Sequence, residues 1–425
     1  MFGKLALDRL VWVTVCMLWV SPLMADPGDS FSFVVIADPH VRASHYTQNK
    51  RRLEQCVDWV NAHQQWADIR LVFVAGDIGW DTHEGGLIIE EARDILDGLD
   101  VPYVPIIGDD DVRFGRDGYD FTQTFEPVYQ RLAELADDPA SGFSNFRKAP
   151  VRVATPDGYG YFHNFAFEYN GVQFVCPDWC SRDGSTSILG TRDDDGDLHD
   201  FAGGTWPWFT RTLADCPKDK RENIVIMAHN PMLTLKGSWL ASIAAGALAF
   251  DHVEFAKLSA FLGNPAYGFA DHIHAAYSGH LHFRAYVPQN ADPGRIELPN
   301  WLAVMIAEKI GRNVFVPLPG YDLYSVQATH FPDPPFGPPT HPQDEVQVEL
   351  VTVTEGADAF SYVSVPILVP WFAWNVPAPA LGGPTRTAKG QPFSAALLMA
   401  AGLCLAVWQR TGSGAFWGAP SVRGR

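Results

Sequence analysis

The sequence is poor in positive charge and has no Asn-x-Ser/Thr sequon. Its 425 residues include 31 Lys and Arg against 49 Asp and Glu, which gives a formal net charge of -18 at pH 7. Nucleic-acid-binding proteins generally carry basic faces, so this balance argues against nucleic acid as the general partner. The same charge would repel an anionic substrate unless metal ions or local Arg and Lys side chains reverse the field near the site. The missing sequon removes one indication of eukaryotic export.

Cysteine is also scarce. Cys16 lies in an N-terminal leader and Cys404 in an apolar C-terminal stretch, so four of the six cysteines remain for the body of the protein. An even number suits an oxidising compartment. One disulfide is expected among Cys176, Cys180 and Cys216, which are near one another in the sequence, and its connectivity stays open. A zinc site is less favoured because the spacings fit no finger pattern.

Long apolar runs are nearly absent, and the two that exist lie near the ends of the chain. Residues 1–25 have a basic start and a short apolar run, Leu10–Val20, as is typical of a secretory signal peptide. Residues 369–391 are rich in Pro and Gly and predict a linker. Within residues 392–410, the apolar part Phe393–Trp408 would span roughly 24 Å as a helix. A buried helix is the alternative, but we favour a membrane anchor or a processed sorting signal on an exported protein.

Three apolar strands alternate with two helices in the first part of the chain. The runs Phe33–Ala37, Leu71–Ala75 and Tyr103–Ile107 are almost continuously apolar, which is typical of strands covered on both faces. The segments Thr47–Trp66 and Leu87–Leu99 carry apolar residues at helical spacing. Short connections between alternating strands and helices predict a parallel α/β core.

The later part of the chain continues with strands, helices and two long loops. Asn170-Gly171 lies between two apolar runs and predicts a hairpin. We interpret Val112–Gly160 as a long irregular insertion bordering the site, and Gly184–Gly204 as a polar loop. The remaining expected strands are Asn223–Met227, His272–Tyr277, Phe283–Val287, Leu302–Ile306, Gln347–Val353 and Ser361–Ile367, and the remaining expected helices are Trp206–Leu213 and Val253–Leu262.

Carboxylate and imidazole side chains follow five of the expected strands. The carboxyl ends of strands in an α/β sheet are the place where ligands bind. A single Asp-x-His triplet is more often a turn Asp beside a hydrogen-bonded His. The ordered set is hard to explain by packing, which favours Val, Ile and Leu, so it indicates a metal cluster. The candidate ligands are Asp38, His40, Asp77, Asp109, His229, His280 and His282.

The order of these motifs resembles the calcineurin-like metallophosphoesterase superfamily. The motifs are ADPH at 37–40, AGD at 75–77, GDDD at 108–111, AH at 228–229 and GHLH at 279–282. The resemblance extends over residues 31–368 and implies a four-layer α/β/β/α sandwich with two metal ions at the carboxyl ends of the strands. It further implies that the first metal is held by Asp38, His40 and His282, that Asp77 bridges both metals, and that the second is held by Asp109, His229 and His280.

These residue types suit phosphoester hydrolysis. Two cations about 3.5–4 Å apart can bind a phosphoryl oxygen and lower the pKa of a bridging water, so that hydroxide attacks phosphorus in line with the leaving oxygen. Mixed imidazole and carboxylate ligands suit Mn, Fe or Zn better than Ca. The predicted function is therefore metal-dependent hydrolysis of small or lipid-linked phosphomonoesters or phosphodiesters.

One motif departs from the family pattern. The family usually has Gly-Asn-His followed by Glu or Asp, where this chain has Gly108–Asp111. Asp109 replaces a neutral amide ligand and raises the ligand charge, with hydroxide, from about -3 to about -4, which favours metal binding but attracts an anionic substrate less. Asp110 replaces the His that in the family assists the leaving group or the phosphoryl oxygens. Asp110 is a candidate catalytic residue, although a carboxyl group acts as an acid only if its pKa is raised.

Four loop residues near the expected strand ends are further candidates. His45 and His83 are candidate catalytic substitutes for the motif His, and Arg42 and Arg113 are candidate phosphate-binding residues. Each is also an ordinary surface residue in the simplest interpretation. The alternative to an enzyme is a module on the same fold that binds metals but turns over poorly. A structural or adhesion domain without metals is less favoured.

Overall fold

The computed structural model describes residues 30–41, 47–79, 87–112, 118–155, 158–182, 196–235, 250, 252–280, 285–287, 315–317, 322–326 and 346–369. The predicted signal peptide, the apolar stretch 392–410 and the strand Leu302–Ile306 lie outside these residues. So does the linker 369–391 apart from Val369, which ends a strand. No helix within the described ranges is long and apolar enough to cross a membrane.

The first sheet has five strands in the order β16-β15-β1-β2-β3. Its central strands are parallel because helices connect them: β1 (Ser30–Ile36), β2 (Ile69–Ala75) and β3 (Tyr103–Ile106). Two long strands, β15 (Val346–Glu355) and β16 (Phe360–Val369), extend the sheet in antiparallel pairing beyond β1. The first two strands are buried along nearly their whole length, as their apolar runs predicted.

The second sheet has seven strands in the order β12-β14-β11-β9-β8-β7-β4. Its parallel centre joins β8, β9, β11 and β14, whereas β4, β7 and β12 pair antiparallel at its two sides. The strand bounds are β4 (Phe143–Lys148), β7 (Phe165–Tyr169), β8 (Val172–Cys176), β9 (Ile224–Met227), β11 (Ile273–Ser278), β12 (Ala285–Val287) and β14 (Asp322–Ser325).

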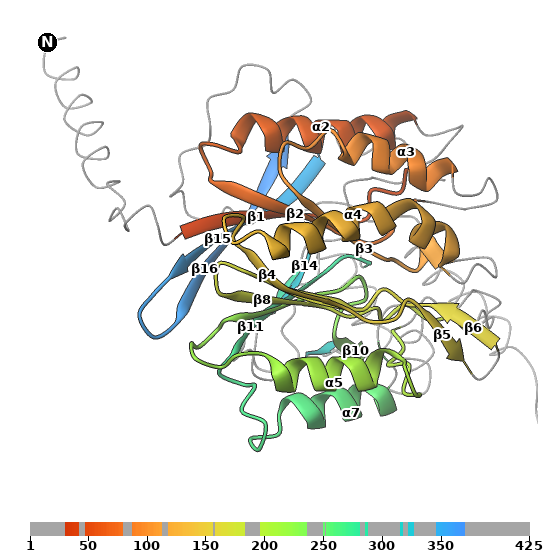
Figure 1. Ribbon diagram of the computed structural model, residues 1–425, viewed down its shortest axis with the longest axis vertical. Helices are drawn as coiled ribbons and strands as arrows, with labels where there is room; N and C mark the ends of the chain where they lie inside the picture. The colour runs from red at the N-terminus through yellow and green to blue at the C-terminus, as the bar shows by residue number, and fades with distance from the viewer. Residues whose placement is uncertain are drawn as a thin grey trace, which may run out of the picture.

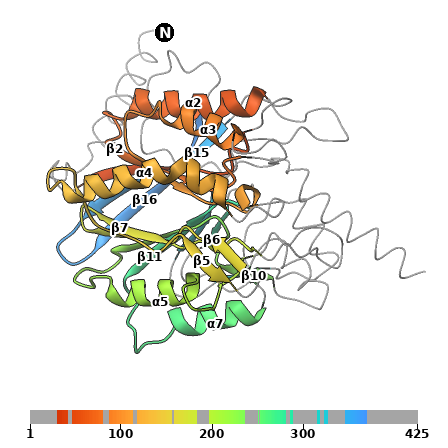
Figure 2. The same cartoon turned by 45° about the vertical axis from the view of Figure 1, so that its right-hand side comes forward.

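The two sheets face each other between helices, which gives the predicted four-layer α/β/β/α sandwich (Figures 1 and 2). Helices α2 (Thr47–His63) and α3 (Leu87–Leu96) pack together on the first sheet, and α5 (Thr205–Asp215) and α7 (His252–Leu262) lie outside the second. Helix α4 (Tyr119–Asp137) contacts α3, β3 and β4. Two small ribbons pair β5 (Arg152–Thr155) with β6 (Gly158–Tyr161), and β10 (Leu233–Leu235) with β13 (Phe315–Pro317). A short helix, η2 (Asp110–Val112), follows β3.

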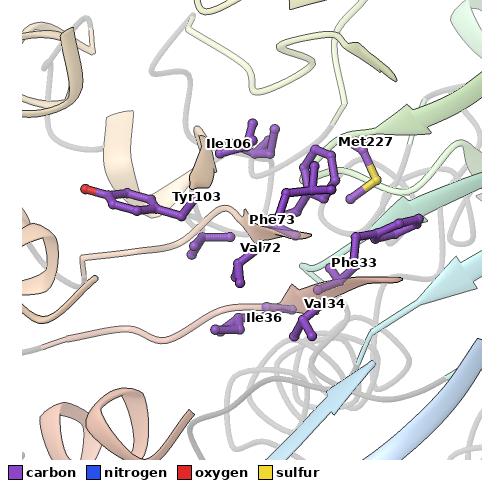
Figure 3. Packing of buried hydrophobic residues seen from close by; sticks show 14 of the residues in the cluster. Phe33, Val34, Ile36, Val72, Phe73, Tyr103, Ile106 and Met227 are labelled. Carbon is purple, nitrogen blue, oxygen red and sulfur yellow. The ribbon is translucent and has the colours of Figure 1, made fainter. Parts of the chain in front are cut away.

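Aromatic side chains join the two sheets. Phe33 of β1 and Phe73 of β2, drawn in Figure 3, are fully buried. The Phe33 ring lies 5.5 Å from Phe174 and 5.7 Å from Tyr277 of the second sheet, in edge-to-face geometry. Such a pair contributes about 0.5–1.5 kcal/mol beyond the area that it buries. This packing holds the sheets face to face and brings their carboxyl ends to one side of the molecule.

Most of the predicted elements are confirmed within a few residues, including the hairpin. Strands β7 and β8 pair antiparallel around Asn170-Gly171, and both turn residues have positive φ, at 45° and 83°. Asn and Gly tolerate this left-handed backbone at little cost. The segments Thr47–Trp66 and Leu87–Leu99 correspond to α2 and α3.

The prediction that Val112–Gly160 is irregular was wrong. This stretch contains α4, β4 and β5 and most of β6. Helix α4 buries Phe121, Phe125, Tyr129 and Leu132, which recur at helical spacing. Pro127 within the helix and Gly118 at its N-cap are helix-breaking signals that hid this period.

The expected disulfide was also wrong. Cys56, Cys176, Cys180 and Cys216 are buried free thiols. They come from separate elements: Cys56 from α2, Cys176 from the end of β8, and Cys216 from the C-cap of α5. Closeness in sequence did not bring three thiols together, because helix α5 separates Cys180 from Cys216. Burial raises the pKa of the Cys176 and Cys180 thiols well above the ordinary value.

Candidate metal centre

The carboxyl ends of five strands deliver buried polar side chains to one place. Strands β1, β2 and β3 come from the first sheet, and β9 and β11 from the second. A buried carboxylate or imidazole normally needs a partner, because desolvation is costly. The side chains gathered here are Asp38, His40, Asp77, Asp109, Asp110, His229 and His280, each at most 8% exposed.

Four of these residues have a left-handed backbone, although none is glycine. The φ angles are 48° at Asp38, 43° at His40, 49° at Asp77 and 66° at His280. A non-glycine residue in this region costs of the order of 1–3 kcal/mol, and such residues concentrate at functional sites. This backbone turns the chain sharply after β1, β2 and β11, where these candidate ligands lie.

Small residues before the ligands allow the strand ends to approach one another. A Cβ at Gly108 would lie 2.0 Å from the backbone nitrogen of Asp77, and one at Gly279 would lie 2.6 Å from the carbonyl oxygen of Ala75. At Gly76, with a φ of 80°, it would lie 2.3 Å from Nδ1 of His229. Each of these glycines immediately precedes a candidate ligand, so glycine is required there for close packing of the loops.

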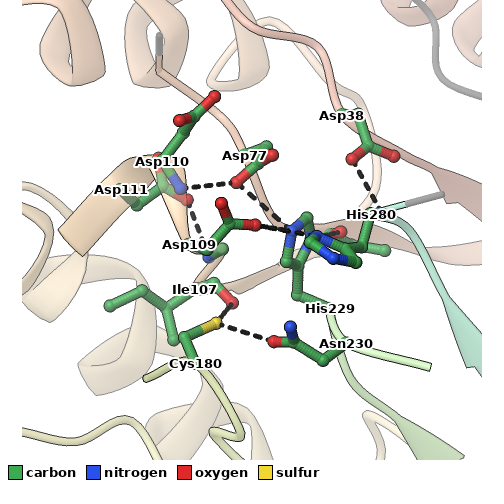
Figure 4. Close-up of polar contacts among 12 residues, drawn as sticks. Asp38, Asp77, Ile107, Asp109, Asp110, Asp111, Cys180, His229, Asn230 and His280 are labelled. Carbon is green, nitrogen blue, oxygen red and sulfur yellow. Dashed lines mark hydrogen bonds and ion pairs between the residues drawn. The ribbon is translucent and has the colours of Figure 1, made fainter. Parts of the chain in front are cut away.

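One carboxylate oxygen of Asp109 contacts two imidazole rings (Figure 4). Its Oδ1 is 2.8 Å from Nε2 of His229 and 2.9 Å from Nδ1 of His280. The other ring nitrogen of His229, Nδ1, donates to the carbonyl oxygen of Ala75 at 2.9 Å. In a neutral ring this donation leaves a lone pair on Nε2, which then faces the Asp109 carboxylate. Two acceptors at this distance require a positive charge between them, either a proton or a metal ion.

Asp77 is placed between the two halves of the centre. Its Oδ1 is 3.3 Å from Nε2 of His229, and its Oδ2 is 3.5 Å from Nε2 of His40. The backbone nitrogen of Asp110 donates to Oδ1 at 2.8 Å and holds the carboxylate in this orientation (Figure 4). One oxygen therefore faces each candidate metal position, as a bridging ligand would.

The electrostatics of the centre follow from the same contacts. Burial by itself lowers the pKa of His229, but the Asp77 and Asp109 carboxylates outweigh it and hold that pKa well above the ordinary value. Burial, together with Asp77 and Asp109, raises the pKa of Asp38 well above its usual range, although His229 opposes this shift. Carboxylates crowded in a buried space thus retain protons that a cation would displace.

The donor set fits metal ions. Ligand atoms within 4.8 Å of one another form three overlapping groups: Asp109 with His229 and His280, Asp38 with Asp77 and His229, and His40 with Asp77 and Asp110. Among the described residues, the buried Nε2 of His280 also has no hydrogen-bond partner. Mixed nitrogen and oxygen donors of this kind suit Mn, Fe or Zn. Six of the seven predicted ligands are therefore brought together.

Asp110 and Asp111 have different surroundings from those that the sequence suggested. Oδ2 of Asp110, the predicted candidate acid, lies 3.1 Å from Nδ1 of His40. Asp111, to which we assigned no role, accepts hydrogen bonds from the backbone nitrogens of Ile78, Gly79 and Gly108 at 2.9–3.2 Å. Burial, with the charge of Asp77, raises its pKa to about 7. Its place as the last acid of the motif was the signal that could have identified it.

A loop after β8 also reaches the centre and was not foreseen. Cys180 Sγ donates to the carbonyl oxygen of Ile107 and to Oδ1 of Asn230, next to His229 (Figure 4). Asp178 pairs with Arg182 in the same loop. The sequence held no motif for these contacts, because they join three strand ends that are far apart in the chain.

Five predicted site residues lie outside the described residues. They are the ligand His282, the candidate catalytic residues His45 and His83, and the candidate phosphate-binding residues Arg42 and Arg113. Their roles stay predictions.

Comparisons with known proteins gave structural likeness without sequence likeness. No protein-family model matches the chain, and none of the curated proteins matches it. Among solved structures, a dimetal phosphatase from Danio rerio is similar over 80% of this chain and 99% of its own, with 11% identity and a TM-score of 0.41. GAP50, described as the anchor in the inner membrane complex of Plasmodium, is similar over 80% of this chain and 85% of its own, with 8% identity and a TM-score of 0.39.

Proposed function

We propose that the protein is a metal-dependent phosphoesterase that hydrolyses small or lipid-linked phosphomonoesters or phosphodiesters. One observation carries the proposal: Asp109 Oδ1 lies 2.8 Å from a ring nitrogen of His229 whose other nitrogen already donates to a carbonyl. That contact needs a proton or a metal ion between the two atoms, and we propose the metal ion. The possible ligands form groups that overlap at Asp77 and His229. Such overlap is expected of a centre that holds two metal ions.

The residues have distinct roles in this proposal. Asp77 would contribute to both metal ions. Asp38, His40 and His282 would hold the first ion, and Asp109, His229 and His280 would hold the second. When bound, such a metal pair supplies a hydroxide nucleophile and stabilises charge on the phosphoryl group. Arg42 and Arg113 bind phosphate oxygens, and His45 and His83 are the candidates for protonating the leaving group.

The ligand charge bears on the substrate. With Asp109 in place of a neutral amide, two divalent cations are nearly neutralised by their ligands, and the chain as a whole carries -18. Such a centre therefore attracts an anionic phosphoester less strongly than a centre with a neutral amide ligand would. We further propose that the protein is exported by residues 1–25 and held at a membrane through residues 392–410, where lipid-linked phosphoesters would be accessible.

The test uses the full chain, purified with detergent and loaded with Mn²⁺ or Zn²⁺. p-Nitrophenyl phosphate and bis-p-nitrophenyl phosphate report monoesterase and diesterase activity. We expect hydrolysis that chelation abolishes and metal restores, and loss of activity in Asp77→Asn. His63→Ala, which removes an imidazole at the far end of α2, is the matched control and should retain activity. Metal-independent turnover, or full activity in Asp77→Asn, would contradict the proposal.

A second candidate function is a metal-binding module that turns over poorly. It is favoured by one observation, the direction of the Asp110 carboxylate toward His40 in place of the family's motif histidine. The double variant Asp109→Asn with Asp110→His restores the usual motif. A large gain in rate would identify the natural chain as a binding module, whereas a loss would identify its motif as adapted to its own substrate.

A further inference from the structure

We propose that the Cys180 thiol is a positioning residue that joins the carboxyl ends of β3 and β9 and so sets the distance between Asp109 and His229. These two strands belong to different sheets, and Cys180 lies in the loop after β8. The inference rests on the proposed function for the expectation that Asp109 and His229 share a metal ion. The join between the two strand ends itself concerns only the protein's own contacts.

The thiol reaches both strand ends (Figure 4). Its Sγ is 3.4 Å from the carbonyl oxygen of Ile107, the first residue after β3, and 3.2 Å from Oδ1 of Asn230. Both oxygen atoms can only accept a hydrogen bond, so the single S–H proton is shared between them. Cys180 is fully buried, and burial raises the pKa of its thiol well above the ordinary value, so the proton is retained.

Both contacted residues adjoin candidate ligands. Asn230 directly follows His229, and only Gly108 separates Ile107 from Asp109. The ligand atoms concerned, Oδ1 of Asp109 and Nε2 of His229, are 2.8 Å apart. A movement of one strand end relative to the other would change this distance directly. Metal binding is sensitive to such a movement, because ligand distances have to be met within about 0.2 Å.

Other contacts hold Cys180 itself in place. Its backbone nitrogen donates to Oδ1 of Asp178, and its carbonyl oxygen accepts from Arg182 and from Nε2 of His199. Asp178 also accepts from the backbone nitrogen of His163 at 2.9 Å and pairs with Arg182. Buried charges that are paired in this way are costly to separate. The sulfur atom is therefore a fixed point against which the two strand ends are placed.

Cys176 shows what a buried cysteine does without such partners. It ends β8, four residues before Cys180, and is 1% exposed. Among the described residues its Sγ makes no hydrogen bond, and burial raises the pKa of its thiol. A buried cysteine of this kind packs as a small apolar residue. The two thiols therefore differ in their contacts and hardly in their burial, which makes Cys176 a matched control.

Calorimetric titration of the full chain with Mn²⁺, in detergent, measures the consequence for metal binding. The unchanged protein should bind two ions. Cys180→Ala should weaken one of the two sites by about tenfold, the lower end of the usual effect of removing an outer contact, and leave the other unchanged. Cys180→Ser, whose hydroxyl can still donate, should recover most of the loss. Cys176→Ala and Cys176→Ser should bind both ions as the unchanged protein does.

Chemical denaturation of the metal-free variants separates this effect from a loss of packing. Both alanine variants lose the packing of one sulfur atom and should be destabilised. At position 180, serine should be more stable than alanine, because its hydroxyl has two acceptors. At position 176 the order should be reversed, because the hydroxyl would be buried there without a partner. Greater stability of alanine than of serine at position 180 would overturn the inference.

Infrared difference spectra distinguish a positioning thiol from a metal ligand. Subtracting the spectrum of Cys180→Ala from that of the unchanged protein isolates the S–H stretching band of Cys180, and Cys176→Ala isolates that of Cys176. We expect the Cys180 band at the lower frequency, since hydrogen bonding weakens the S–H bond, and we expect it to persist when Mn²⁺ is bound. Loss of the band on Mn²⁺ binding would show that the thiolate is a ligand, and the inference would be wrong.

Two titration results would also overturn the inference: normal binding of both ions by Cys180→Ala, or an equal loss of affinity in Cys176→Ala. If the unchanged protein binds two ions but hydrolyses neither p-nitrophenyl phosphate nor bis-p-nitrophenyl phosphate, the proposed function fails, while the titrations still decide the role of Cys180. If the unchanged protein binds no metal ion, both the proposed function and the inference fail.

Discussion

Two buried histidines of this protein have opposite electrostatic surroundings. His229, at the end of β9, and His163, before β7, are 1% and 2% exposed. The Asp77 and Asp109 carboxylates raise the pKa of His229 well above its ordinary value, against the effect of burial. Burial lowers the pKa of His163 well below its ordinary value, and Lys148 and Arg182 add to this effect.

The difference lies in what surrounds each ring. His163 stacks on Tyr129 and meets the edge of Phe121, and its Nε2 contacts the Thr122 hydroxyl at 2.8 Å. That hydroxyl already donates to the carbonyl of Gly118, so the ring must be the donor and can remain neutral. His229 instead faces two carboxylates at the ends of strands. Burial by itself therefore lowers the pKa of a histidine, whereas burial beside two carboxylates raises it.

The largest expected effect comes from exchanging each histidine for alanine. His229→Ala should lower metal affinity and turnover by more than about 100-fold, because it removes a ligand and leaves Asp109 and Asp77 unneutralised. His163→Ala should bind metal normally but lose about 2–4 kcal/mol of unfolding free energy, through lost ring packing and a lost hydrogen bond. Metal titration and chemical denaturation of both variants make the measurement. Normal metal binding by His229→Ala would remove the contrast between the two sites.

Asp111→Ala should be the next largest change. It leaves the backbone nitrogens of Ile78, Gly79 and Gly108 without their acceptor, and each unsatisfied buried group costs about 1–3 kcal/mol. We expect a loss of roughly 3–5 kcal/mol in unfolding free energy, together with weaker metal binding because the loops after β2 and β3 separate. Asp94→Ala on the exposed face of α3 is the control in the denaturation series. Equal stability of Asp111→Ala and the control would show that the three bonds contribute little.

Metal affinity should rise with pH. The raised pKa of His229 means that the metal-free protein keeps a proton there at neutral pH, and a metal must displace it. Below that pKa, one displaced proton changes apparent affinity by about tenfold per pH unit. Calorimetry in two buffers of different ionisation enthalpy counts the released protons. Affinity that is flat between pH 6 and 8 would contradict the assignment.

The raised pKa of His229 also makes the unfolding free energy of the metal-free protein depend on pH. A histidine whose pKa is raised in the folded state contributes stability that is present below about pH 6.5 and lost as pH rises through the raised value. His163, with its lowered pKa, has the reverse effect, because the unfolded chain takes up a proton below about pH 6.5 that the folded chain excludes. Denaturation of the metal-free His163→Ala variant should therefore show less acid sensitivity than the unchanged protein.

The smallest expected effect is that of Asp109→Asn. Amide oxygen can replace the carboxylate oxygen between His229 and His280, but one negative charge is lost. We expect metal affinity to fall and KM for p-nitrophenyl phosphate to fall as well, each by a factor of the order of ten, which corresponds to about 1.4 kcal/mol. Steady-state kinetics at saturating metal measure the second effect. An increase in KM would show that ligand charge does not govern the attraction of the substrate.

The fold was largely predictable because its signals are local. Continuous apolar runs identified β1 and β2, helical spacing identified α2 and α3, and Asn170-Gly171 identified the hairpin. Helix α4 was missed because a proline and a preceding glycine outweighed four buried residues at helical spacing. The prediction of a disulfide was wrong for a different reason. Closeness of cysteines in the sequence does not fix the directions of their side chains in a strand, a loop and a helix cap.

The sequence by itself determined which side chains end the strands, since each candidate ligand follows an apolar run. The tertiary structure decided which partners each of the three consecutive carboxylates contacts. Asp109 faces His229 and His280, Asp110 faces His40, and Asp111 accepts three backbone hydrogen bonds. The physical reason is that all of these partners except Gly108 follow other strands, 32 to 171 residues away, and only the packing of the strands and sheets brings them within contact distance.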